Sequence, residues 1–507
     1  MAETNIYLLR FSGEVGTKAR KTRQRFTDRL VTAIEDGLTT AGIEHRVDRR
    51  WSRLFVHAED PRSEPILRRM FGVQSLSPAV LRRWQDLDDI VAQGAEFFAP
   101  EVAGKKFAVR ARRTSGHPRL PFDSPDIERA LGAALIDGAA GVDLKHPEVT
   151  AGVEVHAREV YLYARHVSAP GGLPMGVEGR ALALISGGFD SAVAAWEAWK
   201  RGVALDFVFF NLGGREHERG VMEVTERLTC DWAYGDWPQL YSVDLRPTVE
   251  RIQAAVKPRY WQLALKGAMY RAASALAEEL GLPALVTGEA LGQVSSQTLP
   301  NLALLDGVVE TPVLRPLVTW NKEQIVATAR AIGTYELSAT VPEFCALEAN
   351  QAMTRGKKEP FERELAALDA AALARAVAER TVHEPRLPEG GRDTPGGLTV
   401  DELPPEATFV DLRNPRDYQA WHWPGALNLE YFKALKAYPS VDRTKTYVLY
   451  CEVGLKSAHL AELMRAEGVE AHHVPAGVSA LRRAERARTA SPATAAPGGS
   501  AADSKDD

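Results

Sequence analysis

Short apolar runs alternate with amphipathic stretches in the middle of the chain, and this alternation predicts strands followed by helices. The order favours a parallel, doubly wound sheet, because each strand must connect to the next through a crossover helix. The expected strands cover residues 181–185, 205–210, 240–243 and 284–287. A shorter α/β unit is expected near the end of the chain, with strands at residues 408–412 and 447–450.

The first 165 residues mix strands and helices in a less regular order, which predicts small α+β units. Strands are expected at residues 6–9, 51–56, 107–113, 149–155 and 160–164, and helices at residues 26–38, 65–70, 87–98 and 126–137. The strand at residues 107–113 should carry Arg110 and Arg112 on one face, opposite Phe107 and Val109, because side chains alternate along a strand.

Segments rich in proline and glycine divide the chain into candidate domains, in particular residues 170–176 and 385–397. The expected domains cover residues 1–60, 61–168, 180–350 and 399–482, joined by linkers at residues 169–179 and 351–398. The second linker is charged and rich in alanine, so it is expected to be helical. The tail, residues 483–507, is expected to be disordered because alanine, proline, glycine and serine dominate it.

Size and composition agree with a multidomain globular protein. A chain of 507 residues is too long for one compact core, so three or four domains are expected. Its content of 45% hydrophobic and 25% charged residues is typical of globular proteins. No apolar run approaches the length of a membrane span, and the first residues show no signal-peptide pattern. The three cysteines argue against a disulfide framework, and we expect a cytoplasmic protein without membrane contact.

The strongest chemical signal is the loop Ser186-Gly187-Gly188-Phe189-Asp190-Ser191, which lies between a predicted strand and a predicted helix. Glycine lets the backbone approach a ligand closely, and the N–H groups at a helix start attract anions. The loop lacks the Gly-Lys-Ser/Thr ending of loops that hold β- and γ-phosphates. It therefore predicts a nucleotide site in which pyrophosphate is the group held.

A second loop, Gly288 to Thr298, also follows a predicted strand, so both loops should lie at the carboxyl edge of one sheet. Together they resemble the PP-loop family of ATP pyrophosphatases, which cleave ATP between its α and β phosphates. The resemblance implies ATP and Mg²⁺, with Asp190 as the metal ligand. It implies nucleotide or phosphate contacts from Ser186, Gly187, Gly188, Ser191, Lys266 and Lys322. Without the resemblance, the two lysines would read as surface residues.

A cysteine loop, Cys451-Glu452-Val453-Gly454-Leu455-Lys456-Ser457, follows the predicted strand at residues 447–450. Inward-pointing N–H groups of such a loop lower the pKa of a thiol and stabilise a thiolate or persulfide. A buried structural cysteine and a phosphatase loop are the alternatives. A phosphatase would need an arginine where Lys456 and Ser457 stand. Asp411-Leu412-Arg413 and His422-Trp423-Pro424-Gly425-Ala426 add a resemblance to rhodanese domains, which carry sulfur as a cysteine persulfide.

The other two cysteines carry less information. Cys345 follows the nucleotide domain, and a second thiol there could resolve a persulfide reaction by forming a transient disulfide. Cys230 has no chemical context and is expected to be a small packing residue.

The N-terminal part of the chain is more basic than the rest. Residues 1–165 hold 26 Lys and Arg against 23 Asp and Glu, whereas the rest of the chain is acidic overall. The basic strand at residues 105–113 could contact RNA phosphates, although a solvated basic surface would have the same composition. The region resembles a THUMP domain behind a ferredoxin-like unit. The expected RNA contacts are Lys105, Lys106, Arg110, Arg112 and Arg113.

Along the chain, a THUMP-like part, a PP-loop domain and a rhodanese domain follow one another. This order resembles one family, the tRNA 4-uridine sulfurtransferases, over nearly the whole chain to residue 482. The family implies an α/β multidomain fold: ferredoxin-like and THUMP domains, a PP-loop domain and a rhodanese-like domain. It implies ATP-dependent adenylation of uridine 8 in tRNA, a persulfide on Cys451 loaded by a cysteine desulfurase, and Cys345 as its resolving partner. It also implies ATP contacts from Leu184, Ile185, Gly288 and Gln297. The residues after Cys345 depart from the family pattern.

Two other readings stay open. The chain could serve mainly as a sulfur relay to a carrier protein for the thiazole of thiamine, with tRNA binding secondary. An RNA-binding protein with a degenerate enzyme core is disfavoured, because both the loop at Ser186 and the loop at Cys451 are intact. The oligomeric state does not follow from the sequence, and a homodimer is one of the open alternatives.

Overall fold

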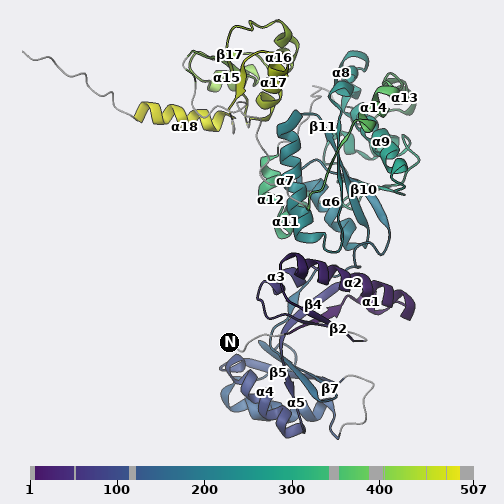
Figure 1. Ribbon diagram of the computed structural model, residues 1–507, viewed down its shortest axis with the longest axis vertical. Helices are drawn as coiled ribbons and strands as arrows, with labels where there is room; N and C mark the ends of the chain where they lie inside the picture. The colour runs from purple at the N-terminus through teal and green to yellow at the C-terminus, as the bar shows by residue number, and fades with distance from the viewer. Residues whose placement is uncertain are drawn as a thin grey trace, which may run out of the picture. The chain divides into compact units, whose positions relative to one another are not determined.

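The computed structural model describes residues 6–50, 53–113, 121–341, 353–386, 404, 406–452, 454–474 and 477–490. The chain forms two compact units (Figure 1). The first comprises Met1–Phe210, Val221–Ala339 and Leu347–Pro388, and the second comprises Asn211–Gly220, Thr340–Ala346 and Glu389–Asp507.

The N-terminal part of the first unit is built on one nine-stranded sheet with the order β2-β3-β1-β4-β8-β7-β5-β6, and β9 pairs with β4. Its strands are β1 (Ile6–Phe11), β2 (Arg46–Arg50), β3 (Arg53–His57), β4 (Val73–Arg83), β5 (Lys106–Arg113), β6 (Gly141–Val142), β7 (Val149–His156), β8 (Glu159–Tyr163) and β9 (Val167–Ser168). Strand β4 has 11 residues and pairs with β1 along its first part and with β8 along its last part. This strand therefore joins the ferredoxin-like and THUMP halves into one sheet.

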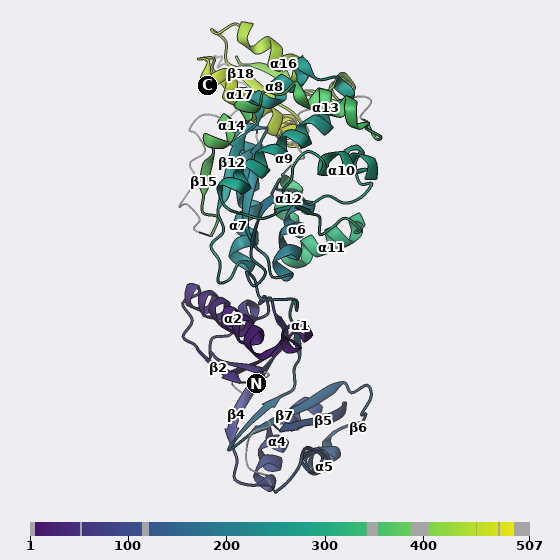
Figure 2. The ribbon, with the colours of Figure 1, turned by 90° about the vertical axis from the view of Figure 1, so that its right-hand side faces the viewer.

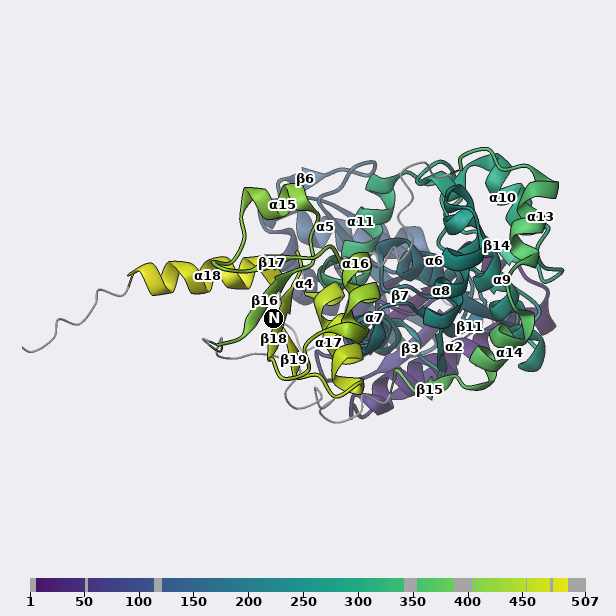
Figure 3. The ribbon, with the colours of Figure 1, turned by 90° about the horizontal axis from the view of Figure 1, so that it is seen from above.

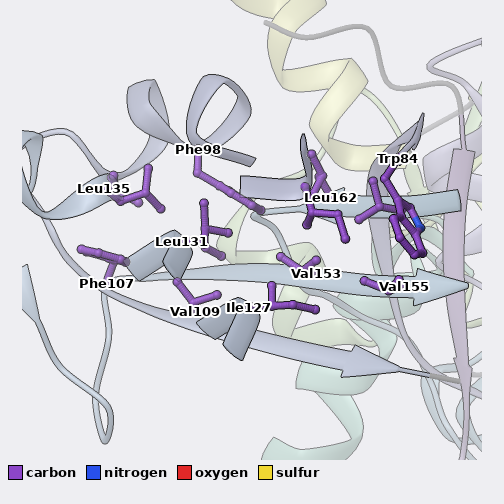
Figure 4. Packing of buried hydrophobic residues seen from close by; sticks show 14 of the residues in the cluster. Trp84, Phe98, Phe107, Val109, Ile127, Leu131, Leu135, Val153, Val155 and Leu162 are labelled. Carbon is purple, nitrogen blue, oxygen red and sulfur yellow. The ribbon is translucent and has the colours of Figure 1, made fainter. Parts of the chain in front are cut away.

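Each half of this sheet is covered by its own helices. In the ferredoxin-like half, α2 (Arg20–Thr40) buries Leu30, Ile34 and Leu38 against the sheet, and the short helices α1 (Gly13–Gly16) and α3 (Ser63–Leu67) lie beside it. In the THUMP half, α4 (Leu87–Val102) and α5 (Ser124–Leu135) cover β5 and β7 (Figure 1). Figure 4 shows the side chains of this half converging between helices and strands, with Phe98, Leu131 and Val153 fully buried.

The central sheet has the order β14-β13-β10-β11-β12-β15. Its strands are β10 (Arg180–Leu184), β11 (Ala204–Asn211), β12 (Leu240–Asp244), β13 (Leu285–Val286), β14 (Val313–Leu314) and β15 (Thr381–His383). The pairs β10–β11, β10–β13 and β13–β14 are parallel, which confirms the predicted doubly wound sheet. Strand β10 pairs with β13 on one side and β11 on the other, so the chain order reverses at its carboxyl end, where such sheets bind ligands.

Helices lie on both faces of the central sheet, with α7 on one side of the strands and α9 on the other (Figures 1 and 3). The helices of this region are α6 (Phe189–Lys200), α7 (Gly214–Trp232), α8 (Arg246–Ala255), α9 (Trp261–Glu279), α10 (Leu299–Asp306), α11 (Lys322–Ile332), α12 (Tyr335–Thr340), α13 (Lys358–Ala366) and α14 (Ala370–Ala378).

The segment expected to be a helical linker packs on the first unit. Helix α13 buries Phe361 and Leu365, and Leu365 lies so close to Gly267 of α9 that a Cβ there would come within 2.9 Å of its Cδ1. After α14 the chain adds β15 antiparallel to β12, and the two strands lie side by side in Figure 2. Helices were expected here, but the strand was not.

A buried ion pair fastens the end of this segment to the ferredoxin-like half. Nη1 of Arg386 donates to Asp36 Oδ2 at 2.9 Å and to the carbonyl oxygens of Ala233 and Asp236. The Gly235 N–H donates to the same carboxylate oxygen at 2.7 Å. Helix α2 and the loop after α7 are thereby held together, because a buried guanidinium requires its acceptors.

The second unit contains a four-stranded parallel sheet with the order β17-β16-β18-β19. Its elements are β16 (Thr408–Asp411), α15 (Pro415–Ala420), β17 (Leu427–Asn428), α16 (Tyr431–Ala437), β18 (Tyr447–Tyr450), α17 (Leu455–Ala466), β19 (Ala471–His473) and α18 (Gly477–Ala490). Leu449 packs in the cluster formed with α16 and α17, whereas Val448 and Tyr450 pack with α18. Figure 3 shows α16 and α17 on one side of these strands and α15 and α18 on the other, which is the expected rhodanese-like α/β fold.

The buried core of the THUMP half makes a stability prediction. Leu131→Ala removes a fully buried side chain from the cluster in Figure 4 and should cost about 2–5 kcal/mol. Leu144→Ala, at an exposed position in the same half, should change stability by less than about 0.5 kcal/mol. Hydrogen-exchange mass spectrometry of β5 and β7 should show loss of protection in the first variant alone. Equal protection in both would mean that this cluster is not the core.

Candidate functional site

The first loop of the candidate nucleotide site turns sharply between β10 and α6. Gly187 has φ +77°, in the left-handed region that glycine tolerates best, and Gly188 is the N-cap of α6. The Oγ of Ser191 accepts the Ser186 N–H at 3.2 Å and donates to the Gly188 carbonyl at 3.0 Å. These bonds close the loop around the helix N-terminus, whose N–H groups attract an anion.

The second loop comes into backbone contact with the first. Strands β10 and β13 are adjacent, so their following loops meet at the same edge of the sheet. A Cβ on Gly288 would lie 2.5 Å from the carbonyl carbon of Asp190 and 2.6 Å from the nitrogen of Ser191. No other residue than glycine fits there without moving the first loop.

The side chain of Asp190 is held from two directions. Nζ of Lys322 lies 3.1 Å from Oδ1 and 3.3 Å from Oδ2, and Nε2 of Gln293 donates to Oδ2 at 2.9 Å. Lys322 is the first residue of α11, where a capping box of Asn321 and Gln324 starts the helix. A positive charge at a helix N-terminus is unfavourable, and the ion pair with Asp190 compensates for it at Lys322.

A second charged network surrounds the buried carboxylate of Glu289. It accepts hydrogen bonds from Lys266 at 2.8 Å, Tyr270 at 2.5 Å and Arg315 at 2.8 Å. Burial by itself raises the pKa of Glu289, but the Lys266 ammonium and the hydrogen bonds from Lys266, Tyr270 and Arg315 outweigh it and lower the pKa to about 2. Glu289 is therefore ionised at neutral pH and holds the Lys266 amine at the edge of the site.

The structure brings most of the predicted nucleotide residues to one edge of the central sheet. The two glycines, the two serines and Asp190 form one loop, and Gly288 touches it. The backbone of Ile185 continues the pairing of β10, since its N–H donates to the Val208 carbonyl, and Leu184 ends the strand. Gln297 is buried, and its Oε1 has no hydrogen-bond partner among the described residues. Such an orphaned acceptor is expected where a ligand completes the site.

Sequence reasoning missed Glu289, Gln293, Tyr270 and Arg315. Glu289 and Gln293 lie inside the second loop, Gly288 to Thr298. The sequence pattern of this loop does not distinguish a buried carboxylate from a solvated one. Tyr270 and Arg315 are distant in sequence, and only the fold brings them to Glu289.

The donor set fits a magnesium ion only together with a phosphate ligand. Within the described ranges, no group of three or more His, Cys, Asp and Glu side chains could form a metal site by itself. Mg²⁺ is commonly held by one or two carboxylates plus substrate phosphates, and Asp190 next to the glycine loop has this arrangement. For Asp190 to bind the ion, Lys322 would have to leave the carboxylate.

The second unit contains the cysteine loop, between β18 and α17. The thiol of Cys451 is buried, and its Sγ accepts the Gly454 N–H at 3.2 Å. The Oγ of Ser457 lies 3.7 Å from the sulfur and donates to the Gly454 carbonyl at 2.8 Å. Gly454 has φ +96° and is the N-cap of α17. The sulfur therefore lies at the N-terminus of α17 and accepts one backbone N–H.

Two contacts fix the base of this loop. A Cβ on Gly477 would lie 2.0 Å from the carbonyl oxygen of Cys451, so only glycine fits beneath it. The buried Arg413 forms a bidentate ion pair with Asp411, and its Nη1 lies 3.4 Å from Oε2 of Glu452, the residue next to the cysteine. These are the Asp and Arg of the motif that suggested a rhodanese domain.

The remaining predicted residues have mixed outcomes. Cys345 lies outside the described residues. Cys230 is exposed, so the prediction that it is a packing residue is wrong. The expected basic residues lie on β5 or just before it, and Lys105, Lys106, Arg110, Arg112 and Arg113 are all exposed. Of these, Arg110 and Arg113 donate to the carbonyl oxygens of Leu144 and Phe122. No helix among the described residues is long and apolar enough to cross a membrane.

Four family descriptions match the chain in order. They are the ThiI ferredoxin-like domain at residues 6–77, the THUMP domain at residues 85–165, "Thiamine biosynthesis protein (ThiI)" at residues 176–369 and the rhodanese-like domain at residues 400–484. The first two ranges lie in the N-terminal nine-stranded sheet and its helices, the third contains the two paired loops, and the fourth contains the cysteine loop.

Relatives with the same name match nearly the whole chain. The tRNA sulfurtransferase of Pyrobaculum aerophilum is 36% identical over 467 residues, which cover 91% of this chain and 94% of the relative. That of Sodalis glossinidius is 34% identical, covering 92% and 98%. The chain therefore belongs to the tRNA sulfurtransferase family.

Two solved structures are similar to this one. A 4-thiouridine synthetase in complex with RNA and bound ATP matches with a TM-score of 0.66 and 29% identity, over 75% of this chain and 99% of that one. The protein PH1313 from Pyrococcus horikoshii Ot3 matches with a TM-score of 0.52 and 25% identity, over 65% and 99%.

The Glu289 network predicts a specific pH dependence. Because its pKa falls from 4.5 to about 2 on folding, the ionised carboxylate stabilises the fold above pH 4.5, and this stabilisation is lost as pH falls through about 2. Glu289→Gln should cost about 3 kcal/mol at pH 7, and the difference from wild type should shrink towards pH 2. Thermal unfolding from pH 7 to pH 2 measures it.

Asp306→Asn is the matched control for this prediction, since Asp306 binds Arg315 of the same network but is half exposed. An exposed pair contributes little, so this variant should stay within about 1 kcal/mol of wild type. A pH-independent difference for Glu289→Gln would contradict an ionised Glu289.

Proposed function

We propose that this chain transfers sulfur to a tRNA uridine in two stages, with ATP activation in the first unit and sulfur carriage on Cys451 in the second. The product is 4-thiouridine at position 8. The observation that carries the proposal is that a member of the tRNA sulfurtransferase family has both features: the paired loops at Asp190 and Gly288, and the loop in which the Cys451 sulfur accepts the Gly454 N–H.

The first stage makes the uridine C4 oxygen a leaving group. That oxygen attacks the α-phosphorus of ATP, pyrophosphate departs, and the uridine carries AMP. The N–H groups of Gly187 and Gly188, with Ser186 and Ser191, would hold the departing pyrophosphate at the start of α6. The similar synthetase–RNA structure contains bound ATP, which supports ATP as the nucleotide used.

Asp190, Lys322 and Lys266 would handle the phosphate charge. Asp190 would hold Mg²⁺, which neutralises phosphate charge when bound. Lys322 now faces Asp190 and would exchange that carboxylate for a phosphate, while Glu289 keeps Lys266 directed at the same edge. Gln297, whose Oε1 has no partner in the described part of the chain, would accept a hydrogen bond from the nucleotide.

The second stage uses the persulfide. A cysteine desulfurase would load sulfur onto Cys451, and the N–H of Gly454 with the start of α17 would stabilise the sulfur anion. The outer sulfur attacks C4 and AMP departs with the C–O bond electrons. The Cys345 thiolate then attacks the Cys451 sulfur, which leaves sulfur on C4 and a disulfide between the two cysteines. A cellular thiol reductant restores both thiols.

Contacts to tRNA would come from the exposed basic residues on β5 and just before it. Arg110, Arg112 and Arg113 with Lys105 and Lys106 are exposed on the THUMP half, where they could neutralise phosphates. The similar synthetase structure is a complex with RNA, which supports RNA as a ligand of this chain.

A second function rests on the family description "Thiamine biosynthesis protein (ThiI)". The Cys451 persulfide could also pass its sulfur to a carrier protein for the thiamine thiazole. This reaction would need the second unit and no ATP loop, so thiazole formation should survive Asp190→Asn while tRNA thiolation is lost.

The decisive experiment follows pyrophosphate release and 4-thiouridine separately in a reaction of the purified chain with ATP, Mg²⁺, tRNA and a desulfurase with cysteine. Cys451→Ser should lower thiolation at least about 100-fold, because no persulfide can form, while tRNA-dependent adenylation continues. Cys230→Ser is the matched control and should behave as wild type, since that thiol lies outside both loops.

Two outcomes would refute the proposal. If wild type forms neither pyrophosphate nor 4-thiouridine, the chain does not catalyse this reaction. If Cys451→Ser folds normally but also fails to adenylate tRNA, the two stages are not divided between the two units.

A further inference from the structure

Phe189 is the one residue of the first loop without a role in the proposed chemistry. It is the first residue of α6, between the N-cap Gly188 and the carboxylate of Asp190. Its ring stacks on Tyr335, the first residue of α12, with ring centroids 5.2 Å apart and planes inclined by 25°. Both rings are partly exposed, so burial in a core does not explain the pair.

Each ring of this stack also has a cation next to it. The guanidinium of Arg330 lies 4.2 Å from the Tyr335 ring centroid, and Nζ of Lys322 lies 5.6 Å from the Phe189 ring centroid. Both cations belong to α11, Lys322 in its first turn and Arg330 in its last. The order Arg330, Tyr335, Phe189, Lys322 therefore joins both ends of α11 to the start of α6.

The turn after α11 sets the position of Tyr335. Gly333 ends α11 with φ +84°, and the N–H of the fully buried Thr334 donates to the Ala329 carbonyl at 3.0 Å. Tyr335 follows at once and starts α12. The tyrosine is thus fixed relative to α11 by backbone geometry, and it can fix Phe189 in turn.

Lys322 needs such support because of its location. Its long side chain is 43% exposed and begins at a helix N-terminus, where a positive charge is unfavourable. Its amine is held by the Asp190 carboxylate at 3.1 Å and by the face of Phe189. If Asp190 turns to a metal ion, the ring face is the contact that stays with the lysine.

We propose that Tyr335 is a positioning residue for Lys322: it fixes the Phe189 ring, whose face keeps the Lys322 amine at the phosphate loop when Asp190 engages the metal. Arg330 also contacts the Tyr335 ring. The inference rests on the proposed function, because the role of Lys322 at the phosphates is part of that proposal. How firmly the Lys322 side chain is held can be measured without any catalytic turnover.

The first test is the rate at which an acetylating reagent modifies Lys322, followed by mass spectrometry of the full chain. Tyr335→Leu should raise that rate about three- to tenfold, the equivalent of one aromatic pair and one cation–π contact. Tyr335→Phe keeps the stacked ring and should match wild type. Lys358, on α13 and 73% exposed, serves as the internal control and should not change.

The second test is a double-mutant cycle on the dissociation constant for ATP with Mg²⁺, measured by isothermal titration calorimetry. Tyr335→Leu should weaken binding about three- to tenfold, and Tyr335→Phe should restore it. In the Lys322→Met background, Tyr335→Leu should have almost no further effect, because the tyrosine acts through that lysine. Arg363→Met, on the exposed face of α13, is the control for surface changes.

The outcomes separate this inference from the proposed function. An unchanged Lys322 modification rate in Tyr335→Leu overturns the inference whether or not the chain is active. An equal loss of ATP affinity in the wild-type and Lys322→Met backgrounds also overturns it. If wild type binds no ATP, the proposed function fails, while a raised Lys322 modification rate would still establish the positioning contact.

Discussion

The close backbone approach of Gly288 to Asp190 and Ser191 is the constraint on which the candidate nucleotide site depends. With a Cβ on Gly288, contacts of 2.5 and 2.6 Å would force the two loops apart. Since β10 and β13 are neighbours in the sheet, the separation would displace the start of α6 and the residues around Glu289 together. One missing methyl group thus lets two loops, about a hundred residues apart, act as one site.

Charge is arranged in two balanced groups at this edge. Asp190 faces Lys322 and is partly exposed, whereas Glu289 is buried among Lys266, Tyr270 and Arg315. A buried network with several satisfied hydrogen bonds resists change, and an exposed pair is easily exchanged for another ligand. We infer that the Glu289 group is the fixed part of the site and that the Asp190 group is the part that responds to a ligand.

The fold was largely predictable where local patterns were strong. The parallel central sheet, the helices α4 and α5 and the cysteine loop all follow from apolar runs bounded by glycine and proline. Strand β4 was missed because Pro78 and two serines interrupt its alternation, although its pairing with both β1 and β8 joins two domains. Strand β15 was missed because Thr381–His383 is too short to show a period, and only its pairing with β12 defines it.

The sequence by itself determined the two loops: a glycine-rich turn that leads from a strand into a helix, and a cysteine at the start of a second such turn. Both are local, because a strand, a turn and a helix start are adjacent in the chain. The tertiary structure alone decided which charges face each other. Glu289 meets Arg315, and Phe189 meets Tyr335, across long separations. Such pairs arise from strand order and helix packing, which no local pattern encodes.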